Sequence, residues 1–563
     1  PYRLAEEVYG IGFKTADKIA RRLGLPATAP ERIEAAIVYS LDRAAKGGHV
    51  FLPREELLSV VEELITDPAC SPETALAELV EKLLDGLKNR RRVFCAPLNS
   101  GEAVYKAGYY YAETGVAKRL QLLLETEPCW DSKRAEAALT LAAHGSIQLT
   151  PAQRRVLEQA LASGVLVVTG GPGTGKTTTI KALLRLFQQL QLKVLLAAPT
   201  GRAARRVAET TGEEASTIHR LLEYSYQEGA GFHFQRHEER PIDAGVVIID
   251  EASMVDLLLM YSLLKAVPRG CRLILVGDVD QLPSVGAGSV LRDIIDSGQI
   301  PSVRLENIFR QAGQSMIIVN AHRVNRGKLP LANIRSTDFY IIKEEDPEKV
   351  AGLVVELCQE RIPNYGPFDP LDDIQVITPM RRTVAGVERL NFLLQQALNP
   401  AHRRKPETSS QGVNFRLGDK VMQVQNNYQR EVFNGDIGRI TSLDLEEGEL
   451  MVSFPDLGGQ REVAYDFREL DELALSYAVS VHKSQGSEYP VIIMPVLTQH
   501  YPLLQRNLLY TGITRARKMA VLVGSWKALA IAVNNDKVLQ RHSNLSRLLQ
   551  SPEEAGSAGA SCE

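Results

Sequence analysis

The chain has 563 residues, which at roughly 100–200 residues per domain predicts about three to five domains. Charged residues make up 24% and hydrophobic residues 44%, an ordinary balance that excludes a mostly disordered or collagenous chain. The 68 acidic residues nearly cancel the 65 basic ones, so the formal charge is −3; this excludes a uniformly basic nucleic-acid coat but leaves room for a local basic groove.

Neither a membrane anchor nor a disulfide framework is indicated by the sequence. No apolar run is long enough to span a bilayer, and no charged-then-apolar leader opens the chain. The six cysteines are scattered and form no CxxC pair, which argues against a zinc cluster and favours the reducing cytoplasm. Because the first residue is Pro1 rather than Met, we expect a fragment that lacks an N-terminal part.

Residues 1–149 are rich in Leu, Ala and Glu and are predicted to form a helical N-terminal domain. At its start, Val8–Ala20 resembles a helix–hairpin–helix, whose two glycines permit a tight turn and whose Lys14 and Lys18 can face a phosphate. Such hairpins bind DNA without regard to sequence; a plain helix–Gly–helix connection that only packs is an equal alternative. Helices and short strands over about 50–112 predict a winged helix.

From Thr150 onward, short apolar runs rich in β-branched residues alternate with helical stretches. They predict two α/β domains, residues 150–335 and residues 336–400 with 473–550, each built on a parallel sheet covered on both faces. The second domain is interrupted at 401–472 by short strands and turns, which predict a small inserted β-barrel. Residues 551–563 are rich in Ser, Glu, Gly and Ala and predict a disordered tail.

A phosphate-binding loop follows the first predicted strand of residues 150–335. The segment Gly170–Thr177 fits GxxxxGK[ST] and opens a helix, which is the context that this motif requires. Backbone N–H groups of the loop can wrap phosphates, while Lys176 is expected to reach the β- and γ-phosphates and Thr177 to ligate Mg²⁺. The predicted ATP-binding residues here are Gly171, Pro172, Gly173, Thr174, Gly175, Lys176, Thr177 and Thr178.

Polar residues end two later strands of the same domain. Asp250 and Glu251 directly follow the apolar run Val246–Ile249, at the carboxyl end where α/β sheets bind ligands. We expect Asp250 to hold Mg²⁺ and Glu251 to polarise the attacking water. Gln281 follows the next strand, and its amide can sense a γ-phosphate without adding charge. Alone, either segment is more often a solvated turn; downstream of a phosphate-binding loop they indicate a nucleotide hydrolase.

Two arginines are candidates for stabilising charge in phosphoryl transfer. Arg310 lies in Asn307–Gln311, and Arg515 lies in Tyr510–Arg517 of the second α/β domain. An arginine delivered from a second domain would tie hydrolysis to closure of the cleft between the domains. A surface ion pair is the ordinary alternative for either residue.

With these motifs in order, the chain resembles superfamily 1 DNA helicases, and within them the RecD family in the stand-alone form that lacks RecB and RecC. The resemblance covers about 150–550, and the N-terminal part more loosely. It implies two RecA-like motor domains, ATP with Mg²⁺ in the cleft between them, an SH3-like module at 401–472, and 5′→3′ travel on DNA. It also implies a bacterial-type, nucleoid-associated monomer that acts on single-stranded and tailed duplex DNA without an obligate protein partner.

The same resemblance assigns further residues. Gln153 matches the adenine-reading glutamine of the family, and Gly486 and Glu488 lie in the second-domain segment Ser480–Glu488 that contacts both DNA and nucleotide. The residues implied to contact single-stranded DNA are Pro199, Thr200, Arg202, Thr217, His219, His482 and Ser484.

A hairpin is predicted at about 223–241, within the first motor domain. Tyr224 and Tyr226 alternate with polar residues, as do Phe232 and Phe234, and a Gly-containing segment separates the two pairs. The bland interpretation is that one aromatic face packs against the domain body. The sharper hypothesis is a pin that meets the end base pair of the duplex and separates the strands.

Two other functions remain compatible with the motifs. A P-loop translocase or remodeller could move on DNA without separating strands, and a nucleotide-gated clamp could bind DNA without being an enzyme. The hairpin favours strand separation, and Glu251 with two candidate arginines argues against a mere switch. A fused nuclease is not indicated, because no further cluster of metal-ligating carboxylates is present.

Overall fold

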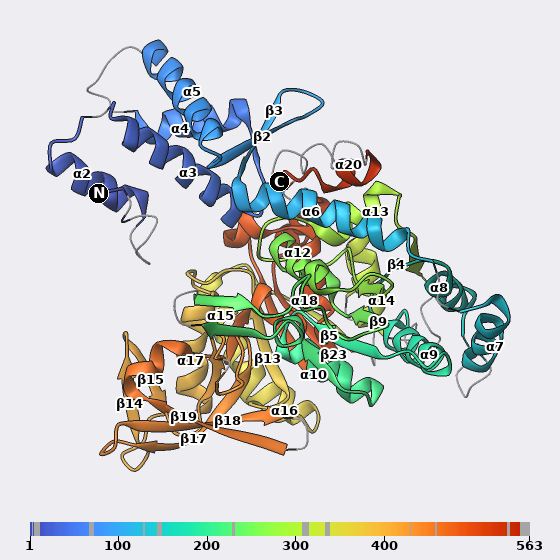
Figure 1. Ribbon diagram of the computed structural model, residues 1–563. Coiled ribbons are helices and arrows are strands. Elements are labelled where there is room, and N and C mark those ends of the chain that lie inside the picture. Colours follow the sequence, from blue (N-terminus) through green and yellow to red (C-terminus); the bar gives the residue numbers. More distant parts are fainter. Residues whose placement is uncertain are drawn as a thin grey trace.

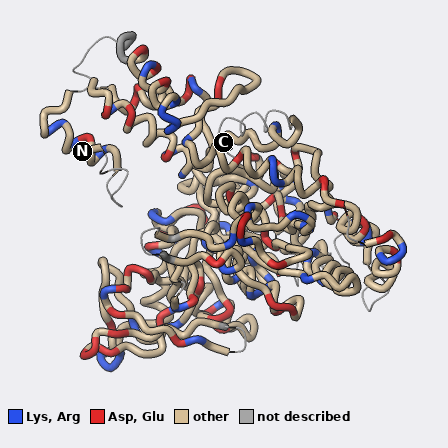
Figure 2. The backbone as a smooth tube through the Cα atoms, viewed as in Figure 1, with Lys and Arg blue, Asp and Glu red and all other residues tan. Residues whose placement is uncertain are grey.

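The protein has four parts: an N-terminal part, two α/β motor domains, and a module inserted in the second motor domain (Figure 1). The computed structural model describes residues 1–2, 4, 12–26, 28–66, 73–127, 130–143, 149–227, 231–306, 315–332, 338–427, 429–456, 459–536 and 541–551. No helix in these ranges is both long and apolar enough to cross a lipid bilayer. Acidic and basic residues are interspersed through all four parts (Figure 2), as the near-zero net charge leads one to expect.

The N-terminal part packs four helices beside a small antiparallel sheet of order β1-β3-β2. The elements are α2 (Phe13–Arg22), α3 (Pro30–Lys46), β1 (Leu52–Pro53), α4 (Arg54–Ile65), α5 (Glu73–Asn89), β2 (Val93–Pro97) and β3 (Glu102–Lys106). Buried Arg32 on α3 donates to Asp17 on α2 at 2.8 Å and fixes the two helices together. The tight turn expected before α2 lies outside the described residues, and the winged helix remains a prediction.

A long helix, α6 (Ala107–Leu124), joins this part to the first motor domain, whose sheet is wholly parallel with order β11-β4-β10-β9-β5-β6. The strands are β4 (Val165–Gly170), β5 (Val194–Ala198), β6 (Ala215–Thr217), β9 (Val246–Ile249), β10 (Arg272–Gly277) and β11 (Ser302–Leu305). Every residue of β4, β9 and β10 is buried, because helices cover both faces. The continuous apolar runs therefore predicted this sheet correctly.

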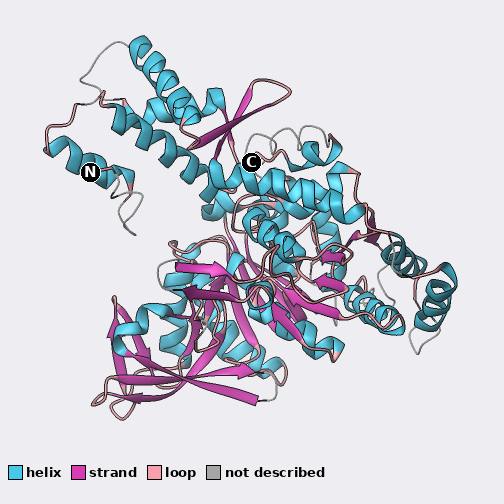
Figure 3. Ribbon diagram, viewed as in Figure 1, coloured by secondary structure: helices cyan, strands magenta, loops and turns pink. Residues whose placement is uncertain are grey.

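Helices alternate with the strands of this domain (Figure 3). They are α8 (Pro151–Ala162), α9 (Lys176–Gln189), α10 (Gly201–Thr211), α11 (Ile218–Leu221), α12 (Leu257–Ala266) and α13 (Val290–Ser297), with α7 (Ser132–Ala143) before them. Because α9, α10 and α11 follow β4, β5 and β6 within a few residues, their N-termini lie at the carboxyl edge of the sheet. A two-stranded hairpin, β7 (Tyr224–Gln227) and β8 (Gly231–Phe234), is inserted between α11 and β9.

The second motor domain repeats this design with a parallel sheet of order β12-β23-β22-β13-β21. Its strands are β12 (Phe339–Lys343), β13 (Ile374–Thr378), β21 (Ala478–Ser480), β22 (Tyr489–Val496) and β23 (Ala516–Gly524). Its helices are α14 (Met316–Asn325), α15 (Pro347–Glu356), α16 (Ile362–Tyr365), α17 (Val387–Leu398), α18 (Arg506–Ile513) and α19 (Trp526–Asn534). Two RecA-like domains are thus present.

The inserted module is a hairpin followed by a five-stranded antiparallel sheet of order β19-β18-β17-β16-β20. Its strands are β14 (Glu407–Ser410), β15 (Val413–Arg416), β16 (Lys420–Gln423), β17 (Ile437–Asp444), β18 (Glu449–Asp456), β19 (Gly459–Asp466) and β20 (Leu473–Leu475). Among these described strands no pair joins β19 to β20, so the small SH3-like sheet stays open. Buried Asp419 accepts from Asn399 at 2.6 Å and Tyr477 at 2.8 Å, which ties both ends of the module to the second motor domain.

The end of the chain leaves the second motor domain and returns to the first. Arg541 donates to the carbonyl oxygens of Ser284 at 2.6 Å and Gly288 at 2.7 Å, both in the first motor domain. Buried Glu113 on α6 then accepts from the backbone N–H of Asn544 at 2.8 Å. The final helix, α20 (Leu545–Gln550), packs on α6 and α13 (Figure 1).

Candidate nucleotide and DNA site

The phosphate-binding loop connects the buried strand β4 to the first turn of α9. Gly173 and Gly175 have φ of 72° and 85°, a left-handed conformation that costs a glycine little and other residues more. The loop lines a cavity of about 260 Å³ between the two motor domains, and its residues there are Gly171, Pro172, Gly173, Gly175, Lys176 and Thr177. Thr174 instead faces inward and donates to the carbonyl of Gly171 at 2.8 Å, and Thr178 does not line this cavity.

The cavity can hold a string of phosphates because positive groups converge on it. The Lys176 ammonium donates to the Gly170 carbonyl at 2.6 Å, and so lies over the loop. The N-terminus of α9 adds the positive end of its dipole. Opposite, the second motor domain contributes Thr514 and Arg515 to the same cavity.

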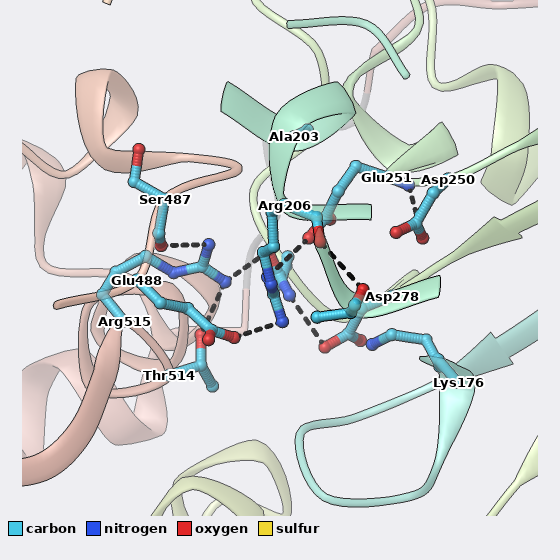
Figure 4. A network of polar contacts seen from close by, with 12 residues as sticks. Lys176, Ala203, Arg206, Asp250, Glu251, Asp278, Ser487, Glu488, Thr514 and Arg515 are labelled. Atoms are coloured by element: carbon cyan, nitrogen blue, oxygen red, sulfur yellow. Dashed lines mark hydrogen bonds and ion pairs between the residues drawn. The ribbon is translucent and has the colours of Figure 1, made fainter. Parts of the chain in front are cut away.

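Asp250 and Glu251 end strand β9 beside this cavity, as predicted from the apolar run before them (Figure 4). Burial and the neighbouring charge of Glu251 raise the pKa of Asp250 to about 6. Burial alone would raise the pKa of Glu251, but the charges of Arg515, Lys176 and Arg206 outweigh it and lower that pKa. Glu251 therefore remains ionised at neutral pH, and its Oε2 atom is buried without a hydrogen-bond partner among the described residues.

A chain of hydrogen bonds joins the two motor domains across the cleft. Gln281 donates from its amide to buried Asp278 at 3.1 Å, and its amide oxygen accepts from Arg515 at 3.0 Å. Arg515 is only 2% exposed, and it also donates to the carbonyl oxygens of Thr511 and Ser487 and to the hydroxyl of Thr514, each at 3.1 Å. Two residues predicted separately, one in each domain, are thus in direct contact.

Arg206 makes a second bridge across the cleft, and sequence reasoning missed it. It lies on α10, 3.6 Å from the carboxylate of Glu251, and it also forms an ion pair with Glu488 of the second domain (Figure 4). The second oxygen of Glu488 accepts from Arg517 at 2.8 Å. In the sequence, the only indication of a role for Arg206 is its position in the segment Gly201–Val207, which contains three arginines.

Tyr510 and His322 pack over the phosphate-binding loop at Gly171, and neither of them was identified from the sequence. A Cβ added to Gly171 would lie 2.9 Å from the Tyr510 hydroxyl and 3.0 Å from Cε1 of His322. Tyr510 donates to Asp278 at 2.7 Å, so this packing is tied to the polar chain through Gln281. The close approach explains why the position carries no side chain.

Gln153 lies under the loop rather than in the cavity. It is fully buried; its amide oxygen accepts from the backbone N–H of Thr150 at 2.9 Å, and its amide nitrogen donates to the Gly175 carbonyl at 3.3 Å. It forms a capping box that starts α8. To read an adenine, this side chain would have to exchange one of these bonds.

The residues implied to contact DNA divide into two groups. Thr217 and Ser484 are buried and make internal hydrogen bonds, Thr217 as the N-cap of α11 and Ser484 to the Val481 carbonyl at 2.8 Å. Arg202 donates to Ser487 at 2.9 Å, across the interface between the domains. Thr217 and Ser484 thus use their hydroxyl groups inside the protein, and Arg202 uses one guanidinium nitrogen at the interface; contact of these three residues with DNA stays a prediction.

Pro199, Thr200 and His482 belong to the region where the two motor domains meet the inserted module. Thr200 is the N-cap of α10, next to Pro199, and a Cβ added to Gly486 would lie 3.1 Å from its hydroxyl. Phe433 of the inserted module lies against Gly201 in the same place. His482 is exposed in the loop after β21. This junction of both motor domains with the insertion is the part of the predicted DNA track that the structure brings together.

A hairpin is present within the predicted range 223–241, with strands over Tyr224–Gln227 and Gly231–Phe234. Tyr224 lies opposite Phe234 and Tyr226 opposite Phe232. The rings of Tyr224 and Phe234 are 4.8 Å apart, and both contact His219 at 5.6 Å. The base of the hairpin thus packs on the domain body, as the bland interpretation expected, and His219 is occupied there. The side chains of Tyr226 and Phe232, and the whole of Arg310, lie outside the described residues.

Comparisons with known proteins agree along the chain. Family models match residues 1–51 (ATP-dependent RecD2 DNA helicase HHH domain), 153–287 (AAA domain), 390–454 (ATP-dependent RecD-like DNA helicase SH3 domain) and 475–523 (UvrD-like helicase C-terminal domain). The ATP-dependent RecD2 DNA helicase of Deinococcus radiodurans is 36% identical over 551 residues, which span 96% of this chain and 72% of that protein. The RecBCD enzyme subunit RecD of Mycolicibacterium smegmatis is 30% identical over 558 residues, 92% of this chain and 94% of that one.

Solved structures of Pif1 helicases are also similar. The one from Bacteroides in complex with ADP-AlF3 and ssDNA is 19% identical, covers 73% of this chain and 99% of its own, and has a TM-score of 0.41. The one from Candida albicans is 19% identical, with coverages of 72% and 99% and a TM-score of 0.41.

Proposed function

The chain belongs to the RecD-like family of superfamily 1 ATP-dependent DNA helicases, and we propose that it moves 5′→3′ on single-stranded DNA by closing and opening the cleft between its motor domains. The observation that carries the opening and closing of the cleft is the contact between Gln281 of one domain and Arg515 of the other. The direction of travel follows from the family resemblance alone. Any ligand that competes for these groups alters the contact between the domains.

We propose the following roles in ATP hydrolysis for the side chains around the nucleotide cavity. Lys176 and the loop amides hold the triphosphate, Glu251 orients and polarises the attacking water, and Arg515 stabilises the charge that develops on the transferred phosphoryl group. Gln281 couples the γ-phosphate position to the second domain. Arg206 forms ion pairs with both Glu251 and Glu488. Because these residues belong to different domains, hydrolysis requires the cleft to be closed.

The residues present fit a magnesium ion. Thr177 lines the cavity, and Asp250 follows the carboxyl end of β9, at the same edge of the sheet and two strands away from β4. A hydroxyl and a carboxylate, with phosphate and water oxygens, are the donors that Mg²⁺ prefers. When bound, the ion would neutralise phosphate charge.

The direction of travel can be tested with two matched duplexes that differ only in carrying a 5′ or a 3′ single-stranded tail. We expect the purified chain alone, with ATP and Mg²⁺, to unwind the duplex with the 5′ tail and to leave the other intact. Strand separation is measured by fluorescence dequenching, with a blunt duplex as the control. Efficient unwinding from the 3′ tail, with the 5′ tail inert, would reverse the proposed direction. A need for an added protein would contradict action as an independent monomer.

The hairpin β7–β8 is proposed to be the strand-separating pin. Replacing residues 225–233 by a short Gly-Ser turn keeps Tyr224 and Phe234, whose rings pack on His219, so the domain body should stay intact. We expect this variant to retain DNA-stimulated ATP hydrolysis and to lose unwinding, because hydrolysis does not use the hairpin.

A milder variant, Tyr226→Ser with Phe232→Ser, keeps the length of the hairpin and removes only its outer aromatic pair. Parallel loss of unwinding in both variants supports an aromatic wedge. Normal unwinding by the trimmed chain would place strand separation elsewhere, and loss of hydrolysis as well would mean that the hairpin is structural.

A further inference from the structure

A groove of about 610 Å³ lies between the N-terminal part and the first motor domain and takes no part in the nucleotide site. One wall is α6 and the other is α12 with the residues that follow it (Figure 1). Four basic side chains line it, Lys118 and Arg119 on α6 and Lys265 and Arg269 on the other wall, against a single carboxylate, Glu238.

The positive charge of this groove is not neutralised. Arg119 pairs with Glu238, but Lys118, Lys265 and Arg269 have no carboxylate partner among the described residues. Elsewhere in the same domain, arginines such as Arg304 have one. Three uncompensated cations facing one groove create a site for a polyanion.

The groove has a fixed shape and offers apolar surface as well as charge. Gly115 lies within α6 at the place where the ring of Tyr261 packs against the helix; a Cβ there would be 2.2 Å from that ring. Glycine weakens a helix, so its presence serves this close packing. Tyr111 and Leu122, both on α6, line the groove while 37% and 36% exposed. Cations beside exposed aromatic and apolar surface suit single-stranded nucleic acid, whose bases stack while its phosphates pair.

The groove is continuous with the hairpin. Glu238 and Pro241, which line it, belong to the segment that returns from β8 to the domain body. The residues of the DNA track at the junction of the three modules, such as Thr200 and Gly486, do not line it. A strand turned aside at the hairpin therefore reaches this groove, whereas the strand gripped by the motor domains lies elsewhere.

We propose that this groove binds the displaced single strand during unwinding, with its phosphates on Lys118, Lys265 and Arg269 and a base against Tyr111. The inference rests on the proposed strand-separating role of the hairpin. It adds a second DNA site to the molecule, one that holds the product strand away from the strand on which the motor travels.

The test compares two forks that share the 5′-tailed strand and the duplex, one with and one without a single-stranded tail on the displaced strand. Affinity is measured by fluorescence anisotropy across a salt series. Each phosphate on a single strand contributes about 0.7 to the slope of log affinity against log salt, so we expect the displaced tail to steepen the slope by about 2. In a triple variant, Lys118→Ala with Lys265→Ala and Arg269→Ala, the tail should add almost nothing.

A matched variant neutralises three exposed lysines elsewhere, Lys343→Ala with Lys349→Ala and Lys527→Ala, and should keep the full effect of the tail. Tyr111→Ala should weaken binding of the tail and leave the slope unchanged. Hydrolysis of ATP stimulated by single-stranded DNA reports folding and should be normal in all variants. If the triple variant responds to the tail as the unaltered chain does, the groove is not a DNA site. If the unaltered chain does not unwind DNA at all, the helicase mechanism itself fails, which is a distinct result.

Discussion

Glu251→Gln is expected to slow DNA-stimulated ATP hydrolysis by about 10²–10⁴-fold while ATP affinity changes little, because general-base catalysis supplies rate accelerations of that order. The carboxylate of Glu251 is ionised and has one oxygen without a partner among the described residues, so it is available to polarise water. The amide of the variant keeps the size of the side chain and loses its basicity. Turnover is measured by phosphate release, and affinity by titration with a fluorescent ATP analogue.

Glu209→Gln is the matched control, since Glu209 is exposed on α10 of the same domain and does not line the nucleotide cavity. It should hydrolyse ATP at the normal rate. Lys176→Ala should differ from both by losing affinity as well as turnover, because the phosphates lose their charge partner. A normal rate in Glu251→Gln would move the general base to another residue.

Arg515→Ala is expected to lower the turnover number for ATP by about 10³–10⁵-fold, the range found for arginines that stabilise phosphoryl transfer from a neighbouring domain or subunit. The loss should fall on turnover far more than on KM, because the transition state carries the charge that the guanidinium meets. Arg515 is buried and reaches Gln281 across the cleft, so its removal also breaks one of the contacts between the domains.

Two comparisons separate catalysis from packing. Arg517→Ala, two residues along and paired at the surface with Glu488, should have a small effect. Combining Arg515→Ala with Gln281→Ala should cost less than the two single changes added together, because the residues act through one contact. An Arg515→Ala enzyme with an unchanged melting temperature and unchanged turnover would remove this arginine from the reaction.

Local signals in the sequence predicted much of the fold and the centre of the site. The phosphate-binding loop, the acidic pair after β9 and the hairpin all depend on residues close in the chain, and strand, loop and helix propensities fix them. The shared aromatic face of the hairpin followed from alternation, since a two-residue period places Tyr224 and Tyr226 on one side of their strand, and the structure adds the register.

Contacts between the modules could not be predicted in this way. Arg206 is one of several arginines in its segment, and only the folded arrangement brings Glu488, 282 positions later, to it. The burial of Ser484 and Thr217 likewise depends on packing that their own neighbours in sequence do not encode. Gln153 shows the same effect in part: the capping-box spacing from Thr150 accounts for one backbone partner of its amide, but its bond to the Gly175 carbonyl depends on the folded arrangement.

The return of the chain to the first motor domain has a mechanical consequence. The polypeptide crosses between the domains once from β11 to α14 and again from α19 to Arg541, which is anchored on the first domain. A rigid body held at two separate points has one easy motion, a rotation about the line through them. The second motor domain is thus linked to the first at two separate places along the chain, and opening of the cleft is restricted to movements that both links allow.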